Sequence, residues 1–279
     1  MGASGARILG GRQSIAGFLN KLPMRHLTGI LGLLMFLACE RETATPIAIT
    51  GYEYFPLSIG REWHYGLDSI VLRPEIGGIR FDSVRLQARE ILVDTLRDLE
   101  DQLWYRGERY DRRSDTLPWR FRQTFLLRTE TTRALRQADN LTFVKLIFSP
   151  REGERWNAQA AFDEYREVEI GGQPMAVYAG WRSRYREVDG PVSVGPPEDS
   201  TAQAFTKGLR VDMADEESAI DYRRAWEVYV AEIGLVYRYI EVYDTQCNAC
   251  CNLDFDQCAD LPWREKAERG FILRQWLTQ

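Results

Sequence analysis

The sequence predicts a mainly β protein, an antiparallel sheet of about nine to eleven strands in a meander, half-barrel or open barrel with few short helices. Many segments alternate apolar and polar residues with a period of two, which is typical of strands with one buried face. Glycine pairs at 77–78 and 171–172 separate such segments, as hairpin turns do. Apolar residues make up 44% of the 279 residues, enough to bury a sizeable core.

The individual strands follow from the positions of their apolar residues. The first places Trp63 and Tyr65 on one face, and the fourth alternates apolar residues with Arg120 and Arg122. Because an arginine-rich face stays in water, we expect this strand to be buried on one side only. Residues 91–102 also fit a short helix, since leucines at 92, 96 and 99 have helical spacing. The expected strands cover residues 63–71, 84–92, 103–105, 119–127, 141–148, 164–170, 175–185, 226–230, 235–243 and 271–276.

The first 38 residues are expected to be a lipoprotein signal peptide. Residues 1–39 contain no acidic residue, and basic residues precede the largely apolar run 27–38. This run is too short to cross a bilayer as a helix, which takes about 20 residues, but it suits the core of a signal peptide. Cys39 follows the run directly. Phe36-Leu37-Ala38-Cys39 resembles the bacterial lipobox, at which the cysteine is acylated. Met24 is the alternative start of translation.

These features divide the chain into a signal peptide (1–38), a lipidated tether (39–53) and a single β-rich domain (54–279). Within that domain, residues 188–222 are rich in proline, glycine and acidic residues and are expected to form a loop insertion. Residues 244–262 are expected to form a Cys-rich loop. The formal net charge is −5, and this acidic balance argues against nucleic acid as a partner.

Four cysteines besides Cys39 fall within the segment CNACCNLDFDQC. In an exported domain, an even number favours disulfides. A bond between the neighbours Cys250 and Cys251 would strain the backbone. Two pairings then remain, Cys247–Cys250 with Cys251–Cys258 or Cys247–Cys251 with Cys250–Cys258. The alternatives are a zinc site of four thiolates, for which the second separated C-x-x-C pair is missing, and a redox-active pair of Cys247 and Cys250.

The same segment carries possible oxygen ligands at Asn252, Asp254, Asp256 and Asp260. Their spacing is similar to that of a calcium loop, but the glycine that makes the EF-hand turn is missing. A solvated acidic loop is the simpler interpretation. The sequence therefore predicts no metal and no cofactor.

Three motifs give the chain a family resemblance. They are Tyr54-Phe55-Pro56-Leu57 followed by Gly60, Trp63 and Tyr65; Gly153-x-x-Trp156; and Gly234-Leu235-Val236-Tyr237-Arg238. Over most of residues 54–279 the chain resembles uncharacterised secreted lipoproteins of Bacteroidota. The resemblance implies an envelope location and a β-rich fold, with motif residues that look like core aromatics and strand turns. More loosely, the meander of short strands resembles the half-barrel lipoprotein carriers of the bacterial envelope.

The scarcity of histidine argues against most hydrolytic mechanisms. His64 is the only histidine outside the signal peptide, and the sequence has no G-x-S-x-G motif. We therefore expect no catalytic residue and no enzymatic activity, but a lipid-anchored envelope protein that serves as a binding or assembly module. The alternatives are a carrier that holds an apolar ligand in a half-barrel and an envelope hydrolase that uses paired carboxylates.

The expected partners follow from the lipid anchor and the fold. The first is the membrane, reached through the lipid on Cys39. The second is an envelope protein or a small apolar ligand. Glu40, which follows the acylated cysteine, favours the outer membrane, while the face of that membrane is left open.

Overall fold

The computed structural model describes residues 50–75, 78–196 and 202–278, of which 59% are in strands and 7% in helices. The expected signal peptide, Cys39 and most of the expected tether lie outside these residues. The elements are η1 (Tyr52–Tyr54), β1 (Glu62–Glu75), β2 (Gly78–Arg97), β3 (Leu103–Arg112), β4 (Arg120–Thr129), β5 (Arg133–Ala138), β6 (Leu141–Ile147), β7 (Arg155–Trp156), β8 (Val168–Ile170), β9 (Gln173–Met175), β10 (Ser183–Val194), β11 (Gln203–Glu217), β12 (Asp221–Val230), β13 (Gly234–Asp244), α2 (Asn248–Cys251), α3 (Phe255–Ala259), α4 (Trp263–Lys266) and β14 (Arg269–Leu277).

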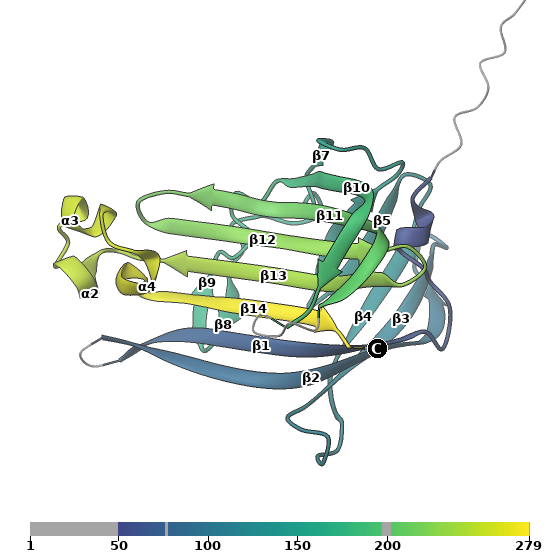
Figure 1. The fold of residues 1–279 in the computed structure, drawn as a ribbon, viewed down its shortest axis with the longest axis horizontal. Helices are drawn as coiled ribbons and strands as arrows, with labels where there is room; N and C mark the ends of the chain where they lie inside the picture. The colour runs from purple at the N-terminus through teal and green to yellow at the C-terminus, as the bar shows by residue number, and fades with distance from the viewer. Residues whose placement is uncertain (1–49, 76–77, 197–201, 279) are drawn as a thin grey trace, which may run out of the picture. The chain divides into compact units, whose positions relative to one another are not determined.

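Twelve strands form one antiparallel sheet in the order β6-β5-β4-β3-β2-β1-β14-β13-β12-β11-β10-β7 (Figure 1). Most neighbours in the sheet are also neighbours in the chain. The pairing of β1 with β14 is different, because it joins the first half of the chain to its last strand, from Tyr65 opposite Leu277 to Leu72 opposite Gly270. The sheet curls into a nearly closed barrel, which confirms the predicted mainly β fold.

The edge strands of the sheet are β6 and the two-residue β7, which pairs only with Ser183 and Arg184 of β10. Beyond β7, a side chain of β10 bridges to β6. The hydroxyl of Tyr185 on β10 donates a hydrogen bond to the carbonyl of Ile147 on β6 (2.6 Å) and accepts one from its N–H (2.8 Å). Beside it, the N–H of Val144 donates to the carbonyl of Ala158, just after β7, at 2.9 Å. A side chain and a short strand thus replace the missing strand pairing and protect the sheet edges.

Replacing Tyr185 with phenylalanine is expected to lower the free energy of unfolding by about 1–2 kcal/mol, because both backbone groups of Ile147 lose their partner. Urea unfolding followed by tryptophan fluorescence measures the change. Tyr165, which is 67% exposed, provides the matched control, and Tyr165→Phe should leave stability unchanged. Equal stability of the two variants would show that the bridge does not hold the edges together.

The prediction of a loop insertion over residues 188–222 is wrong for most of its length. β10 and β11 occupy much of this segment, and they pair from Arg184 opposite Asp212 to Val194 opposite Gln203. Leu209, Val211 and Met213 alternate with less buried residues, so β11 has a normal inward face. Bulges around Val188 and Gly190 bend the hairpin. The segment suggested a loop because prolines and acids such as Asp189, Pro191 and Asp212 lie within these strands.

The alternative of a helix over residues 91–102 is also wrong. β2 continues to Arg97, with Leu92 fully buried opposite Gly107 of β3. Leu96 and Leu99 are exposed, so the helical spacing of the leucines does not reflect a shared buried face. The described residues contain fourteen strands rather than nine to eleven, since β7, β8 and β9 are only two or three residues long.

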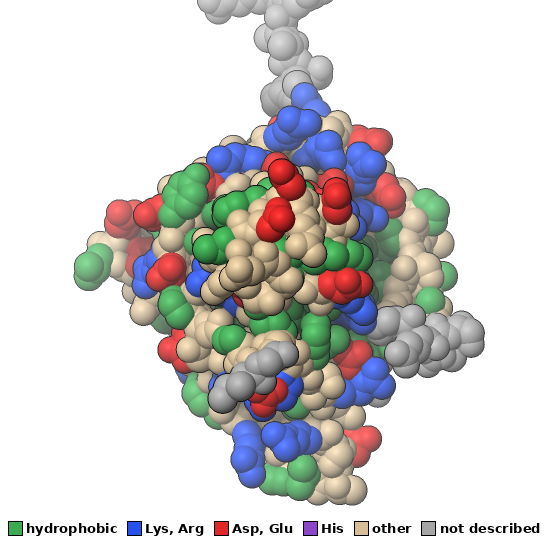
Figure 2. Space-filling model, turned by 90° about the vertical axis from the view of Figure 1, so that its left-hand side faces the viewer, with side chains coloured by type: hydrophobic (Ala, Val, Ile, Leu, Met, Phe, Trp, Pro, Cys, Tyr) green, Lys and Arg blue, Asp and Glu red, His purple; other side chains and the backbone are tan. Residues whose placement is uncertain are grey.

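The surface mixes charges of both signs with scattered apolar side chains, as Figure 2 shows for the end of the molecule that carries α2 to α4. No helix among the described residues is long and apolar enough to span a bilayer.

Candidate functional site in the barrel interior

Six charged side chains from six strands meet inside the barrel, and we call them the charged layer. They are Glu90 on β2, Arg109 on β3, Arg136 on β5, Lys145 on β6, Glu227 on β12 and Arg238 on β13. Charged residues are almost never fully buried unless they are paired. The alternation of each strand places these residues inward, so the fold brings together groups that are far apart in the sequence.

Glu90 holds one half of this layer. Its carboxylate, 2% exposed, receives two hydrogen bonds from Arg136, at 2.9 and 2.8 Å. Arg109 lies 3.6 Å from the same carboxylate, and its Nε donates to Asp111 at 3.1 Å. Two parallel bonds between a guanidinium and a carboxylate fix both groups in place.

Glu227 holds the other half and is 1% exposed. It accepts hydrogen bonds from Lys145 Nζ and from Arg238 Nε, each at 2.7 Å, and from the hydroxyl of Tyr229 at 2.6 Å. One carboxylate therefore compensates two buried cations. This excess of positive charge is the electrostatic signature of the site.

The environment shifts the pKa of four of these groups. Burial alone would lower the pKa of Arg238, but Glu227 and Glu90 outweigh it and raise that pKa. Burial alone would raise the pKa of Glu90 and Glu227, but the cations beside them outweigh it and lower both to about 2. Burial lowers the pKa of Lys145 to about 8, with Arg238 and Arg136 acting in the same direction and Glu227 opposing them. Both carboxylates thus stay ionised at neutral pH, while the ammonium of Lys145 is the least stable charge.

A cavity of about 680 Å³ lies above the charged layer, a volume within the usual range of ligand pockets. Arg136, Lys145, Glu227 and Arg238 form its base. Aromatic residues of β6 and of the segment between β9 and β10 form a wall, in which Tyr178 packs edge-on against Phe143 and against Trp181, each with ring centroids 5.1 Å apart. Ile240, Phe271 and Leu273 complete its apolar lining.

Two buried polar side chains that line this cavity have no hydrogen-bond partner among the described residues. Gln159 is 1% exposed, and both its amide oxygen and its amide nitrogen are unpartnered. Trp181 is 3% exposed, and its indole N–H is unpartnered. Buried polar groups without partners are rare and often mark a functional site. Both residues line the cavity, and their unpartnered polar atoms are buried in its wall.

Two of the three motifs behind the family resemblance meet on the opposite side of the charged layer, while Trp156 of the third packs against Tyr185. Phe55 and Leu57 lie with Trp63, Tyr65 and Gly234 around a small pocket of about 30 Å³, which shares Arg136, Lys145 and Arg238 with the large cavity. The indole of Trp63 donates to the carbonyl of Ile233 at 2.6 Å, and the hydroxyl of Tyr65 donates to that of Leu235 at 3.0 Å. These residues form core and turn structure, as expected from the sequence, and close this end of the barrel.

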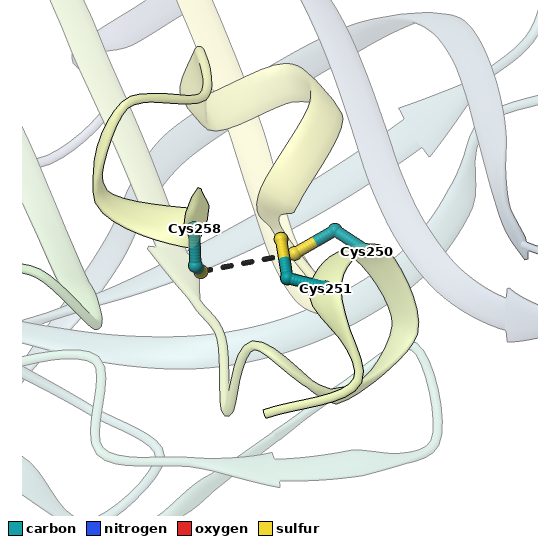
Figure 3. A group of neighbouring side chains, drawn as sticks. All are labelled: Cys250, Cys251 and Cys258. Carbon is teal, nitrogen blue, oxygen red and sulfur yellow. Dashed lines mark hydrogen bonds between the residues drawn. The ribbon is translucent and has the colours of Figure 1, made fainter. Parts of the chain in front are cut away.

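The cysteine cluster lies between β13 and β14, in the segment that forms α2 and α3. Cys247 and Cys258 form a disulfide, so neither predicted pairing is present, although the expectation of a disulfide is confirmed. Cys250 and Cys251 are free thiols, and Cys250 Sγ lies 3.7 Å from Cys258 Sγ (Figure 3). The spacing argument missed this pairing because it assumed that all four cysteines are paired, which would have left the neighbours Cys250 and Cys251 to bond with each other.

Three of the four sulfurs, those of Cys250, Cys251 and Cys258, lie within 4.8 Å of one another. A tetrahedral zinc site requires four ligands, and Cys258 is already consumed by the disulfide. Burial raises the pKa of the Cys251 thiol to about 11, so this group stays protonated at neutral pH. In this oxidised form the cluster offers few of the thiolates that zinc binds.

The disulfide predicts two different mutational outcomes. Cys247→Ser with Cys258→Ser should lower the free energy of unfolding by about 2 kcal/mol, the low end for a disulfide because the closed loop is short. Cys250→Ser with Cys251→Ser should change it little. The intact mass of the denatured wild type should lie about 2 Da below the reduced value, since one disulfide removes two hydrogens. A deficit of about 4 Da would contradict the structure by requiring a second disulfide.

The oxygen ligands considered for calcium serve the helices instead. The carboxylate of Asp254 caps α3 by accepting the N–H of Gln257 at 3.1 Å, and Asp256 lies in the first turn of the same helix. Asn252 and Asp260 occupy the positions that end α2 and α3. Among the described residues, the carboxylates of this segment do not gather into a metal-binding group.

His64 is remote from the charged layer. Its ring nitrogen Nε2 is hydrogen-bonded to the carboxylate of Glu62. The ring also packs edge-on against Trp119, with ring centroids 5.9 Å apart. Its side chain is 31% exposed beside a hollow lined by Arg112 and Asp115. His64 and the two buried carboxylates therefore do not share a cleft.

The sequence did not single out the charged layer, although two of its members carried a signal. Lys145 interrupts the apolar run LTFVKLIF, and Glu227 stands between Trp226 and Val228 in a strand expected to be buried. A charge in the middle of a central strand indicates an internal partner. Which charge pairs with which follows only from the strand order. Gln159 gave no signal, because it lies in a segment with no strand pattern.

Comparison of the chain with protein-family models, with curated proteins and with solved structures finds no match. The resemblance to Bacteroidota lipoproteins therefore stays a prediction.

Proposed function

We propose that this chain is a non-enzymatic lipoprotein of the bacterial envelope that binds a small ligand inside its barrel-like sheet. The observation that carries the proposal is the cavity, in which Gln159 and Trp181 present buried polar groups without partners. A largely apolar cavity with a few convergent polar groups is the usual form of a ligand site. The apolar run before Cys39 and the lipobox-like sequence support the anchor and the outer-membrane location.

The electrostatics favour binding over hydrolysis. A general acid must carry a proton near neutral pH, whereas the pKa values of Glu90 and Glu227 are lowered to about 2. The cations that lower them also occupy the oxygens that would contact a substrate. Both buried carboxylates are committed to ion pairs with these cations.

Native mass spectrometry of the full chain, exported by a Gram-negative host and purified in detergent, tests ligand binding. We expect an organic adduct that survives gentle ionisation and is lost on denaturation. Ala138→Trp places a large side chain at the cavity lining and should abolish the adduct, whereas Ala204→Trp at an exposed position should keep it. A bare native mass would reject the binding proposal and favour an assembly module.

The anchor has its own test. Wild type should fractionate with the outer membrane and carry the added mass of acyl chains on Cys39. Cys39→Ser should be released into the soluble fraction, because the cysteine sulfur and its lipid hold the protein to the membrane. If Cys39→Ser stays with the membrane, the protein is not anchored in this way.

A further inference from the structure

The base of the cavity carries more positive than negative charge. Four buried or half-buried cations, Arg109, Arg136, Lys145 and Arg238, face three carboxylates, those of Glu90, Glu227 and Asp111. The outer lining is mixed, with Arg122 and Arg166 near Asp139, Glu167 and Glu169. The excess of positive charge therefore lies at the buried base of the cavity, where an uncompensated charge costs the most free energy.

Three cations of this base still have hydrogen atoms to donate. Arg238 uses its Nε for Glu227 and Arg109 uses its Nε for Asp111, and the terminal nitrogens of both have no hydrogen-bond partner among the described residues. The ammonium of Lys145 lies 2.7 Å from each carboxylate oxygen of Glu227 and makes a long contact of 3.9 Å with Met213 Sδ. Arg136, by contrast, directs both terminal nitrogens at Glu90. Because Lys145 and Arg238 share a single carboxylate, they are the pair best placed to receive a further anion.

The remaining lining suits an apolar body with polar substituents. Phe143, Tyr178 and Trp181 offer ring faces and edges, while the unpartnered amide of Gln159 and indole N–H of Trp181 lie buried in the same wall, where a small side-chain shift would expose them to a ligand. A purely apolar ligand would leave these polar groups and the cationic excess unsatisfied.

We infer that the ligand is a small organic anion, whose acidic group binds Lys145 and Arg238 and whose apolar body lies along the aromatic wall. This inference rests on the proposed function and specifies the ligand class for it. It also differs from the purely apolar ligand expected from the sequence. The anion supplies the missing negative charge, so binding relieves an electrostatic cost of the empty barrel.

The test compares two probes that share one ring system, 2-naphthoate and its neutral amide, 2-naphthamide. Each is titrated calorimetrically into the full-length protein, against a detergent blank. The inference requires that naphthoate bind at least about tenfold more tightly than the amide. Equal or tighter binding of the amide would overturn the inference and leave the proposed function intact. Binding of neither probe, together with a bare native mass, would reject both.

Variants of Lys145 locate the acidic group. Lys145→Met should weaken naphthoate at least about tenfold and leave the amide unchanged, whereas Lys145→Arg should keep the preference for the anion. Lys207→Met is the matched control, because Lys207 is 47% exposed and does not line the cavity. An unchanged naphthoate affinity in folded Lys145→Met would overturn the assignment to Lys145. If Lys145→Met does not fold, Lys145→Arg is used instead. Retained preference for naphthoate over the amide then supports the assignment, and loss of that preference overturns it.

Discussion

Replacing Glu227 with glutamine is expected to lower the free energy of unfolding by about 3–5 kcal/mol, the largest effect of any single substitution considered for this protein. The amide keeps the shape of the carboxylate but removes the negative charge that Lys145 and Arg238 share at 2.7 Å. Breaking a buried ion pair in this way leaves uncompensated charge in a medium that solvates it poorly. Chemical unfolding of the purified protein at pH 7 measures the loss.

Glu75→Gln provides the control for this prediction. Glu75 pairs with Arg80 at 3.2 Å, but both side chains are about half exposed, so this variant should lose less than about 1 kcal/mol. A double variant, Glu227→Gln with Lys145→Met, should regain part of the lost stability, because one of the two orphaned cations is gone. If Glu227→Gln behaves like Glu75→Gln, water solvates the charged layer and the electrostatic argument for the ligand fails with it.

The low pKa of Glu227 also predicts how the free energy of unfolding changes at acid pH. The pKa of Glu227 is about 2 in the folded protein and about 4.5 when unfolded, so its contribution is complete above pH 4.5 and is lost as the pH falls towards 2. The difference in stability between wild type and Glu227→Gln should therefore shrink by about 3 kcal/mol between pH 5 and pH 2. A difference that does not depend on pH would contradict the low pKa.

The strands could be predicted from the sequence because their signal is local. Period-two alternation located β1, β4 and β13, and the glycine at 234 marked the turn between β12 and β13. This pattern failed to identify β10 and β11, because prolines and acids within the strands outweighed the buried positions between them. The helix alternative over 91–102 failed because leucine spacing does not reveal which leucines are exposed.

The charged layer could not be predicted in this way, because it depends on contacts between distant strands. Arg136 and Glu90 are 46 residues apart, and Lys145 and Glu227 are 82 apart. The pairing of β1 with β14 determines that these strands close around one interior. The disulfide was mispredicted for another reason, because the sequence does not reveal that Cys250 and Cys251 stay free. Local sequence patterns therefore predicted many of the strands, whereas the candidate site depends on how distant strands are arranged in the sheet.

Unpartnered polar groups in the wall of an empty ligand cavity lower the free energy of unfolding. Gln159 buries an amide oxygen and an amide nitrogen without partners, and each such group costs about 1–3 kcal/mol. In a cavity that binds a ligand, the ligand recovers this cost by bonding to the amide. The residues that weaken the empty protein are then the ones that hold the ligand.

Gln159→Leu is accordingly expected to raise the free energy of unfolding by about 2–3 kcal/mol and to weaken ligand binding at least about tenfold. Gln275→Leu is a matched control, because Gln275 is also fully buried with an unpartnered amide but does not line the cavity. It should be stabilised to a similar degree and bind as wild type does. Unfolding and probe titrations on the three proteins decide the matter. Lower stability in Gln159→Leu, or equal binding in both variants, would mean that the amide serves the fold and not the ligand.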